Sequence, residues 1–215
     1  MDMRNYYNKR AKEYDDVYLR KDPASQTQLA DIGRDLQDTV RGRRVLEVAS
    51  GTGYWTEKAT LTALHVTGID FAPEMIKTAE TKKLPQEKVA FRAGDAYALT
   101  KDGGPFDAAF AMFWFSHIPR SRIGEFLTGL NAVLEPGSPV MMADNQFSDI
   151  AGGEFVRKSG EEDTFRIRTL ADGTRHEIIK NYFDEAELSA LFLPFGSDLK
   201  VTARENFWWV RYRTP

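Results

Sequence analysis

The 215-residue sequence contains no cysteine. This absence excludes disulfides, thiolate metal ligands and cysteine nucleophiles. Histidine is also rare, and His65, His117 and His176 lie too far apart to show the spacing of a metal site, so no bound metal is expected. No Gly-x-Ser-x-Gly nucleophile elbow is present, which leaves a serine hydrolase without support.

Long hydrophobic runs and a strong net charge are missing as well. The longest apolar run, 108–115, has eight residues, whereas a membrane-spanning helix needs roughly 20. The first residues lack the apolar stretch of a signal peptide. The net charge of −3 argues against a standing attraction to nucleic acid. We therefore expect a cytoplasmic protein that has neither a membrane nor a nucleic acid as partner.

The middle of the chain alternates short apolar strands with helical patterns. The expected strands are 43–49, 65–70, 88–93, 106–113 and 139–143. Such alternation predicts right-handed crossovers and an α/β fold with a parallel sheet that is covered on both faces. The length and the 42% hydrophobic content fit a single domain, residues 1–215.

The flanking segments do not show this alternation of strands and helices. Tyr7, Ala11, Tyr14 and Tyr18 recur at helical spacing and predict an N-terminal helix with these residues on one face. A second helix begins at Asp22, which can cap it.

After the fifth strand the chain becomes polar, and 146–163 reads as a loop. A hairpin is expected from 165–170 and 174–179, which flank Ala-Asp-Gly. A capped helix follows, and then two strands, 199–204 and 207–212, that are joined too closely to be parallel. With the five strands of the middle segment, these two bring the expected main sheet to seven strands, and the hairpin is separate.

A glycine-containing loop lies where the first buried strand passes into a helix. Residues 45–56 read VLEVASGTGYWT. Small residues at Ala49, Gly51 and Gly53 let the backbone approach a ligand closely, and the helix N-terminus offers free N–H groups. On its own, the pattern is equally typical of an ordinary tight turn.

Two acidic residues strengthen the case for a ligand. Asp70 ends the second strand and Asp95 follows the third. Because the carboxyl ends of parallel strands meet at one sheet edge, both acids should lie beside the glycine loop. Asp70 stands where a carboxylate accepts hydrogen bonds from the ribose of a nucleoside. A dinucleotide fold needs a third glycine where this chain has Thr56, and it leaves Asp95 without a role.

Across 43–145 the sequence resembles the class I (Rossmann-like) S-adenosylmethionine-dependent methyltransferases, in particular the small-molecule, type 11/12-like branch. The resemblance rests on the loop at 47–53, on Asp70 and Asp95, and on the segments 106–110 and 134–137. Ala49 replaces the first glycine of the family's loop, a change that adds one methyl group.

The resemblance implies a doubly wound, mostly parallel seven-stranded sheet whose last strand is antiparallel. It further implies an N-terminal helical lid at 1–42, a cofactor-binding core at 43–145, and an insertion with a hairpin on the acceptor side at 146–180. The C-terminal helix and strand pair occupy 181–215.

The resemblance also implies which residues bind S-adenosylmethionine. Glu47 and its loop would hold the methionine part, Asp70 the ribose, and Asp95 with the backbone of Ala96 the adenine. The full expected set is Tyr14, Glu47, Ala49, Ser50, Gly51, Thr52, Gly53, Asp70, Phe71, Met75, Asp95, Ala96 and Phe113.

The acceptor side is predicted from the ends of the fourth and fifth strands. His117 is the candidate general base; the alternatives are a polar helix cap or a neighbour of the cofactor without proton chemistry. The candidate pocket residues are Tyr7, Trp114, His117, Asp144 and Asn145. Arg157, Arg166 and Arg168 could pair with an anionic acceptor, or they could be solvent-facing charges on an edge hairpin.

The predicted function is methyl transfer from S-adenosylmethionine to a small-molecule acceptor, with S-adenosylhomocysteine as product and with O-, N- and C-methylation all open. A monomer or a homodimer is expected. One alternative, an RNA or protein methyltransferase, is opposed by the acidic pI of 5.7 and by the lack of an Asn/Asp-Pro-Pro-aromatic motif at 113–116. The other is a non-catalytic S-adenosylmethionine-binding protein, since a fold alone does not prove activity.

Overall fold

The structure is a computed structural model that describes residues 3–18, 22–149 and 152–215. Parts of two expected segments, residues 1–2 and 19–21 of the lid and 150–151 of the insertion, lie outside the described residues. No helix in the described ranges has both the length and the apolar character that crossing a membrane requires.

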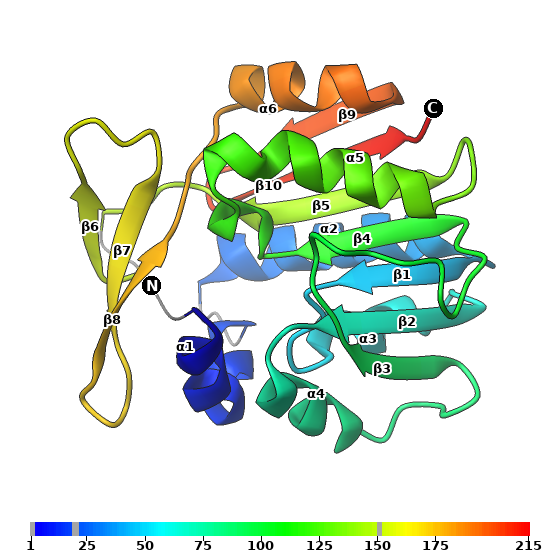
Figure 1. Cartoon of the computed structure of the whole chain (residues 1–215), viewed down its shortest axis with the longest axis horizontal. Coiled ribbons are helices and arrows are strands. Elements are labelled where there is room, and N and C mark those ends of the chain that lie inside the picture. Colours follow the sequence, from blue (N-terminus) through cyan, green and yellow to red (C-terminus); the bar gives the residue numbers. More distant parts are fainter. Residues whose placement is uncertain (1–2, 19–21, 150–151) are drawn as a thin grey trace.

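A seven-stranded sheet forms the centre of the molecule, in the order β3-β2-β1-β4-β5-β10-β9 (Figure 1). The pairs from β3 to β5 are parallel, and β10 is antiparallel to both of its neighbours, which confirms the expected fold. The strands are β1 (Arg44–Val48), β2 (His65–Asp70), β3 (Val89–Ala93), β4 (Ala108–Met112), β5 (Pro139–Asn145), β9 (Ser197–Ala203) and β10 (Phe207–Arg213).

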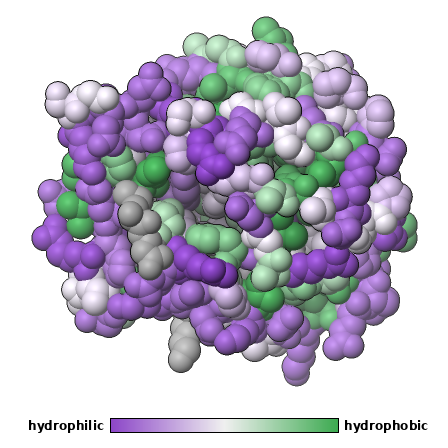
Figure 2. Space-filling model, viewed as in Figure 1, coloured by the Kyte–Doolittle hydropathy of each residue, from purple (hydrophilic) through white to green (hydrophobic). Residues whose placement is uncertain are grey.

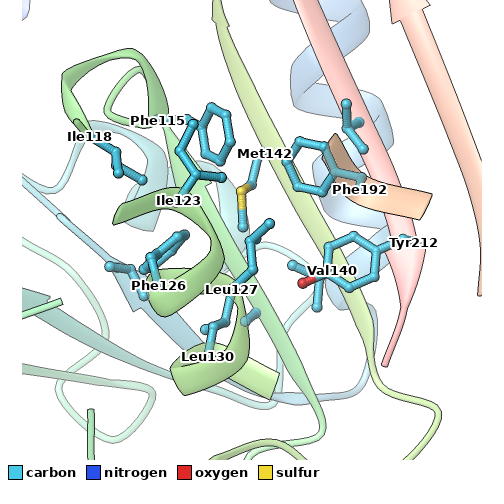
Figure 3. Packing of buried hydrophobic residues seen from close by; sticks show 14 of the residues in the cluster. Phe115, Ile118, Ile123, Phe126, Leu127, Leu130, Val140, Met142, Phe192 and Tyr212 are labelled. Carbon is cyan, nitrogen blue, oxygen red and sulfur yellow. The ribbon is translucent and has the colours of Figure 1, made fainter. Parts of the chain in front are cut away.

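Helices cover both faces of this sheet: α2 (Pro23–Val40), α3 (Tyr54–Ala59) and α4 (Pro73–Glu80), then α5 (Ile123–Val133) and α6 (Glu185–Phe192). Strand β4 is apolar throughout because it contributes to a core on each side. Ala109 and Ala111 pack with α5 and α6, whereas Ala108 and Phe110 pack with α2 and α3. Figure 3 shows the first of these cores.

The N-terminal segment differs from the single helix that the tyrosine spacing predicts. Helix α1 (Met3–Arg10) gives way to a more tightly wound 3-10 helix, η1 (Ala11–Tyr18). Tyr7 packs near Phe71 with ring centroids 6.0 Å apart, but Tyr18 stacks on Tyr54 at 4.0 Å. The prediction of a single α-helix is therefore wrong, but the tyrosines still lie side by side, since the Tyr14 ring is 6.1 Å from the Tyr7 ring and 6.3 Å from the Tyr18 ring.

The segment between β5 and α6 forms a second, three-stranded antiparallel sheet of β6 (Glu154–Arg157), β7 (Thr164–Thr169) and β8 (Arg175–Ile179). The expected hairpin is present as β7 and β8. The interpretation of 146–163 as loop is wrong at β6, a short strand without apolar alternation that is stabilised by pairing with β7.

Helix α1 lies between this small sheet and the carboxyl ends of the central strands (Figure 1). Lys9 pairs with Asp172 at 3.2 Å, and the Tyr6 and His176 rings are 5.5 Å apart. The face shown in Figure 2 is mostly hydrophilic, and its hydrophobic residues form separate groups. The lid is thus held from both the core and the insertion.

Candidate active site

The carboxyl ends of β1 to β4 open into a cleft of about 630 Å³, within the usual range for small-ligand sites. Topology brings residues from distant parts of the chain to this edge. The lining comprises Met3, Arg4, Tyr7, Ala49, Ile69, Asp70, Phe71, Ala93, Gly94, Asp95, Ala96, Tyr97, Trp114, His117, Pro119, Arg122 and Ile179. A small adjoining cavity adds Tyr14, Gly51, Met75 and Met112.

Asp70 is the buried acid of this cleft, with 6% of its surface exposed. Its carboxylate accepts hydrogen bonds from the backbone N–H of Gly51 at 2.9 Å and of Ala72 at 2.8 Å. Burial raises the pKa of Asp70 to about 6, although these hydrogen bonds act in the opposite direction. The carboxylate therefore fixes the glycine loop while facing the cleft.

The loop needs left-handed backbone at three positions: Ala49 (φ 55°), Gly51 (φ 55°) and Gly53 (φ 76°). A Cβ at Gly53 would also come within 3.1 Å of the Phe91 ring. Alanine in this region costs about 1–2 kcal/mol. Ala49 in place of the family's first glycine is thus more than one added methyl group, because it also strains the backbone.

The other loop residues lie behind the cleft. Ser50 and Thr52 are buried, and the Thr52 hydroxyl donates to Asp15 of the lid. Glu47 does not line the cleft; its Oε2 accepts from the Thr56 hydroxyl at 2.5 Å. Thr56, which occupies the third-glycine position of a dinucleotide loop, is therefore the partner of Glu47.

Burial raises the pKa of Glu47 from 4.5 to about 8. The native state then keeps a proton that the unfolded state releases, so this group lowers stability progressively as pH rises from 4.5 to 8. We expect the unfolding free energy of Glu47→Gln to rise relative to that of the wild type by up to about 1.4 kcal/mol per pH unit across this window. Urea unfolding between pH 5 and 8 measures this; the exposed Glu57→Gln serves as control, and a pH-independent difference would contradict the prediction.

Asp95 follows β3, lines the cleft and is exposed. Its Oδ1 accepts from the backbone N–H of Tyr97 at 2.9 Å, and Ala96 lies beside it. The Arg122 guanidinium lies 3.4 Å from the centre of the Tyr97 ring. Tyr97 and Arg122 were not predicted, because no motif in the sequence connects them.

A second cavity, of about 370 Å³, lies between the lid and the small sheet. It is lined by Arg10, Tyr14, Tyr18, Leu29, Phe113, His117, Asn145, Gln146, Phe147, Ser148, Gly152, Arg168, Lys180, Tyr182, Glu205, Asn206 and Phe207. His117 lines both the first cleft and this second cavity, and Tyr14 lines the second cavity and the small one. The two spaces are therefore neighbours with a shared wall.

The consecutive residues after β4 line different spaces. Phe113 has left-handed backbone (φ 58°) and lines the second cavity, although it was expected beside the cofactor. Trp114 and Tyr7, expected in the acceptor pocket, line the first cleft. Asn145 lines the second cavity as expected for an acceptor-side residue.

Asp144 lines neither space, because it is fully buried beneath them. Lys180 donates to Asp144 Oδ1 at 2.7 Å and to the Ser116 hydroxyl at 2.6 Å. Burial opposes the charge on Asp144, but the Lys180 ammonium and the hydrogen bonds from Lys180 and the Ser116 backbone outweigh it and hold the pKa of that carboxyl below its ordinary value. Sequence reasoning missed Lys180, which follows an apolar strand as an ordinary strand end.

The imidazole of His117 is held by the small sheet, since Nδ1 donates to the carbonyl oxygen of Ile179 at 2.6 Å. This bond places the proton on Nδ1 and leaves Nε2 unprotonated. Burial and the adjacent Lys180 hold the pKa of His117 far below 6.5. The ring is therefore neutral near pH 7 and a weak proton acceptor.

The three arginines of the insertion take different positions. Arg157 is exposed, as expected of an edge charge. Arg166 is 1% exposed and donates to Tyr182, Gly153 and Ser148. Arg168 lines the second cavity. The solvent-facing interpretation is wrong for Arg166 and Arg168.

A doubly wound sheet with this strand order and a nucleoside-sized cleft beside the β1 loop defines a Rossmann-like methyltransferase architecture. Residues 45–137 match the family described as "Methyltransferase domain". The chain belongs to the class I S-adenosylmethionine-dependent methyltransferases of the small-molecule type: it is 34% identical over 165 residues, 68% of each chain, to demethylmenaquinone methyltransferase of Staphylococcus aureus (strain JH9).

Solved structures agree with this assignment. The complex of DhpI with SAM and HEP superposes with a TM-score of 0.80 at 30% identity, over 98% of this chain and 95% of that one. A Burkholderia thailandensis 1,6-didemethyltoxoflavin N1-methyltransferase shares the fold, with a TM-score of 0.64 at 19% identity over 99% and 87% of the two chains. The protein is an S-adenosylmethionine-dependent methyltransferase.

Proposed function

We propose that the first cleft holds S-adenosylmethionine and that the second cavity holds a small-molecule methyl acceptor. The observation that carries this proposal is the wall shared by the two spaces. His117 lines both, and Tyr7 and Tyr14 of the lid lie at their junction with the small cavity. Two ligands on either side of this wall would be close enough for a group to pass between them.

The residues of the first cleft fit the cofactor. The buried carboxylate of Asp70 suits two ribose hydroxyls, and it already lies against the left-handed loop at Gly51. Asp95 and the backbone of Ala96 suit the adenine edge, with the rings of Phe71 and Trp114 along the cleft. Met75 and Gly51 line the small cavity on the methionine side. Glu47, hydrogen-bonded to Thr56, acts by supporting the loop.

S-adenosylmethionine supplies an already activated methyl group, so the protein mainly needs to orient the two ligands and exclude water. The lid does both, because Tyr7 and Tyr14 close over the cleft while Asp15 of η1 ties it to the loop at Thr52 and to Lys82, just after α4. The relatives also act on small molecules, by their names demethylmenaquinone and 1,6-didemethyltoxoflavin.

Incubation of the protein with S-adenosylmethionine labelled in its methyl group and with pooled metabolites tests this function. We expect label to appear in a small molecule together with S-adenosylhomocysteine. Asp70→Ala is the matched control that should remove the label. Label in RNA or protein but not in small molecules would contradict the proposal.

We further propose that His117 positions the ligands as a neutral side chain and is not a general base. In His117→Gln the side-chain amide can still donate to the Ile179 carbonyl. We expect kcat to fall less than about tenfold, whereas loss of a general base costs 10²–10⁴-fold, on the order of three decades. The pH-rate profile should keep its shape. A larger loss that also removes the acid limb of the profile would identify His117 as the base.

A further inference from the structure

The second cavity is surrounded by positive charge. Arg10 of the lid, Arg168 of β7 and Lys180 after β8 all line it. The acid in the lining, Glu205, is exposed at the rim and forms no ion pair with the residues that the structure describes. The protein as a whole carries a net charge of −3, so this concentration of cations is local.

Lys180 is paired with Asp144. Among the side chains that the structure describes, no carboxylate forms an ion pair with Arg10, Arg166 or Arg168. Arg10 donates to the neutral Tyr6 hydroxyl at 2.8 Å and lies over the Tyr14 ring. Arg166 donates only to neutral oxygens.

Arg168 has the least compensation of these cations. Its Nε is buried without a hydrogen-bond partner, and no described residue accepts a hydrogen bond from its guanidinium. The guanidinium lies against Gly152, where an added Cβ would be only 3.2 Å from its terminal nitrogens. Buried donors of charged groups that lack an acceptor are costly and rare in native proteins. The arrangement therefore has the donors of an anion site without the acceptor.

The cations also repel one another. Burial lowers the pKa of Arg168, and Arg10 lowers it further. Burial lowers the pKa of Lys180 as well, and Arg168 and Arg10 add to that effect. A bound anion would reverse this repulsion, and the planar guanidinium fork matches the geometry of carboxylate and phosphate oxygens.

We infer that the second cavity binds the methyl acceptor through an oxyanion group, a carboxylate, phosphate or sulfate type of oxygen, with Arg168 as the specificity-determining contact and Arg10 of the lid as a second cation in the lining. This inference rests on the proposed function, since it takes the second cavity to be the acceptor site. It also explains why the insertion carries arginine at a position that packs inward.

The carboxylate in the methionine part of the cofactor is a second source of the same chemistry. The two sources differ in what Arg168 affects. If Arg168 binds the acceptor, its replacement weakens the binding of an anion beside S-adenosylhomocysteine. If Arg168 binds the cofactor, its replacement weakens the binding of S-adenosylhomocysteine itself.

Calorimetry on the full chain separates these outcomes. S-adenosylhomocysteine is titrated first, and inorganic phosphate or sulfate is then titrated into the saturated complex. We expect both anions to bind the wild type and to bind Arg168→Gln at least about tenfold more weakly, the value of one charge-assisted hydrogen bond. Arg168→Lys should recover part of this loss. Arg175→Gln, an exposed arginine of β8 paired with Glu154, should match the wild type.

Each result decides between specific alternatives. Failure of S-adenosylhomocysteine to bind the wild type would remove the proposed function. Normal S-adenosylhomocysteine binding without anion binding, or an equal loss in Arg175→Gln, would overturn the inference and leave the function intact. A tenfold lower affinity of Arg168→Gln for S-adenosylhomocysteine would also overturn the inference, because it would assign Arg168 to the cofactor site. Unchanged thermal unfolding of Arg168→Gln verifies that the variant folds.

Discussion

Asp70→Ala is expected to weaken the binding of S-adenosylmethionine and S-adenosylhomocysteine by at least about 100-fold. A hydrogen bond to a charged group contributes about 1.5–3 kcal/mol, and this carboxylate would accept two from the ribose. The substitution also removes the acceptor that fixes the N–H of Gly51, so the glycine loop loses a constraint at the same time. Isothermal titration calorimetry at pH 7.5 measures the effect.

Two variants make this result specific. Asp70→Asn keeps the shape and one acceptor oxygen, and we expect an intermediate loss of affinity. Asp102→Ala removes an exposed aspartate that lines none of the cavities named above, and it should bind like the wild type. Equal affinities in Asp70→Ala and the wild type would remove the first cleft as the cofactor site.

Lys180→Met is expected to cost about 3–5 kcal/mol of unfolding free energy, because it leaves the buried carboxylate of Asp144 without its cation. Backbone N–H groups of Ser116 and Asn145 still donate to this carboxylate, but they carry no charge. In a protein of this size the loss corresponds to a fall in Tm of about 10 °C. Urea and thermal unfolding, followed by tryptophan fluorescence, measure it.

The double variant Asp144→Asn, Lys180→Met separates loss of the pair from loss of packing. Once both charges are gone, no unpaired ion remains in the interior, and at least half of the lost stability should return. Lys200→Met, at an exposed lysine of β9, is the matched control and should change stability by less than about 0.5 kcal/mol. A single Lys180→Met variant as stable as this control would show that the pair does not hold the insertion to the core.

The fold could be predicted because its strongest signals are local. Short stretches of sequence are enough to recognise a continuous apolar strand such as β4, a glycine or proline boundary, and the close connection between β9 and β10. Strand β6 has no such local signal, since it is short and depends on pairing with β7. The change from α1 to a 3-10 helix depends likewise on packing, as Tyr18 stacks on a ring 36 positions further along the chain.

The first cleft could be predicted from the sequence, whereas the second cavity could not. Parallel strands carry their final residues to one edge, so Asp70 and Asp95 could be placed in one cleft from their positions alone. The second cavity forms where the lid meets the insertion, and no rule of topology places Arg10 near Arg168. The pairing of Asp144 with Lys180 joins residues 36 positions apart and required the structure.

A crystal structure of the protein with S-adenosylhomocysteine tests the central claim most directly. We predict that both ribose hydroxyls lie within about 3 Å of the Asp70 carboxylate, that the adenine lies beside Asp95 and Ala96, and that the sulfur faces the second cavity across the wall formed by Tyr14 and His117. A nucleoside bound in the second cavity, or a sulfur directed away from His117, would contradict the assignment of the two sites.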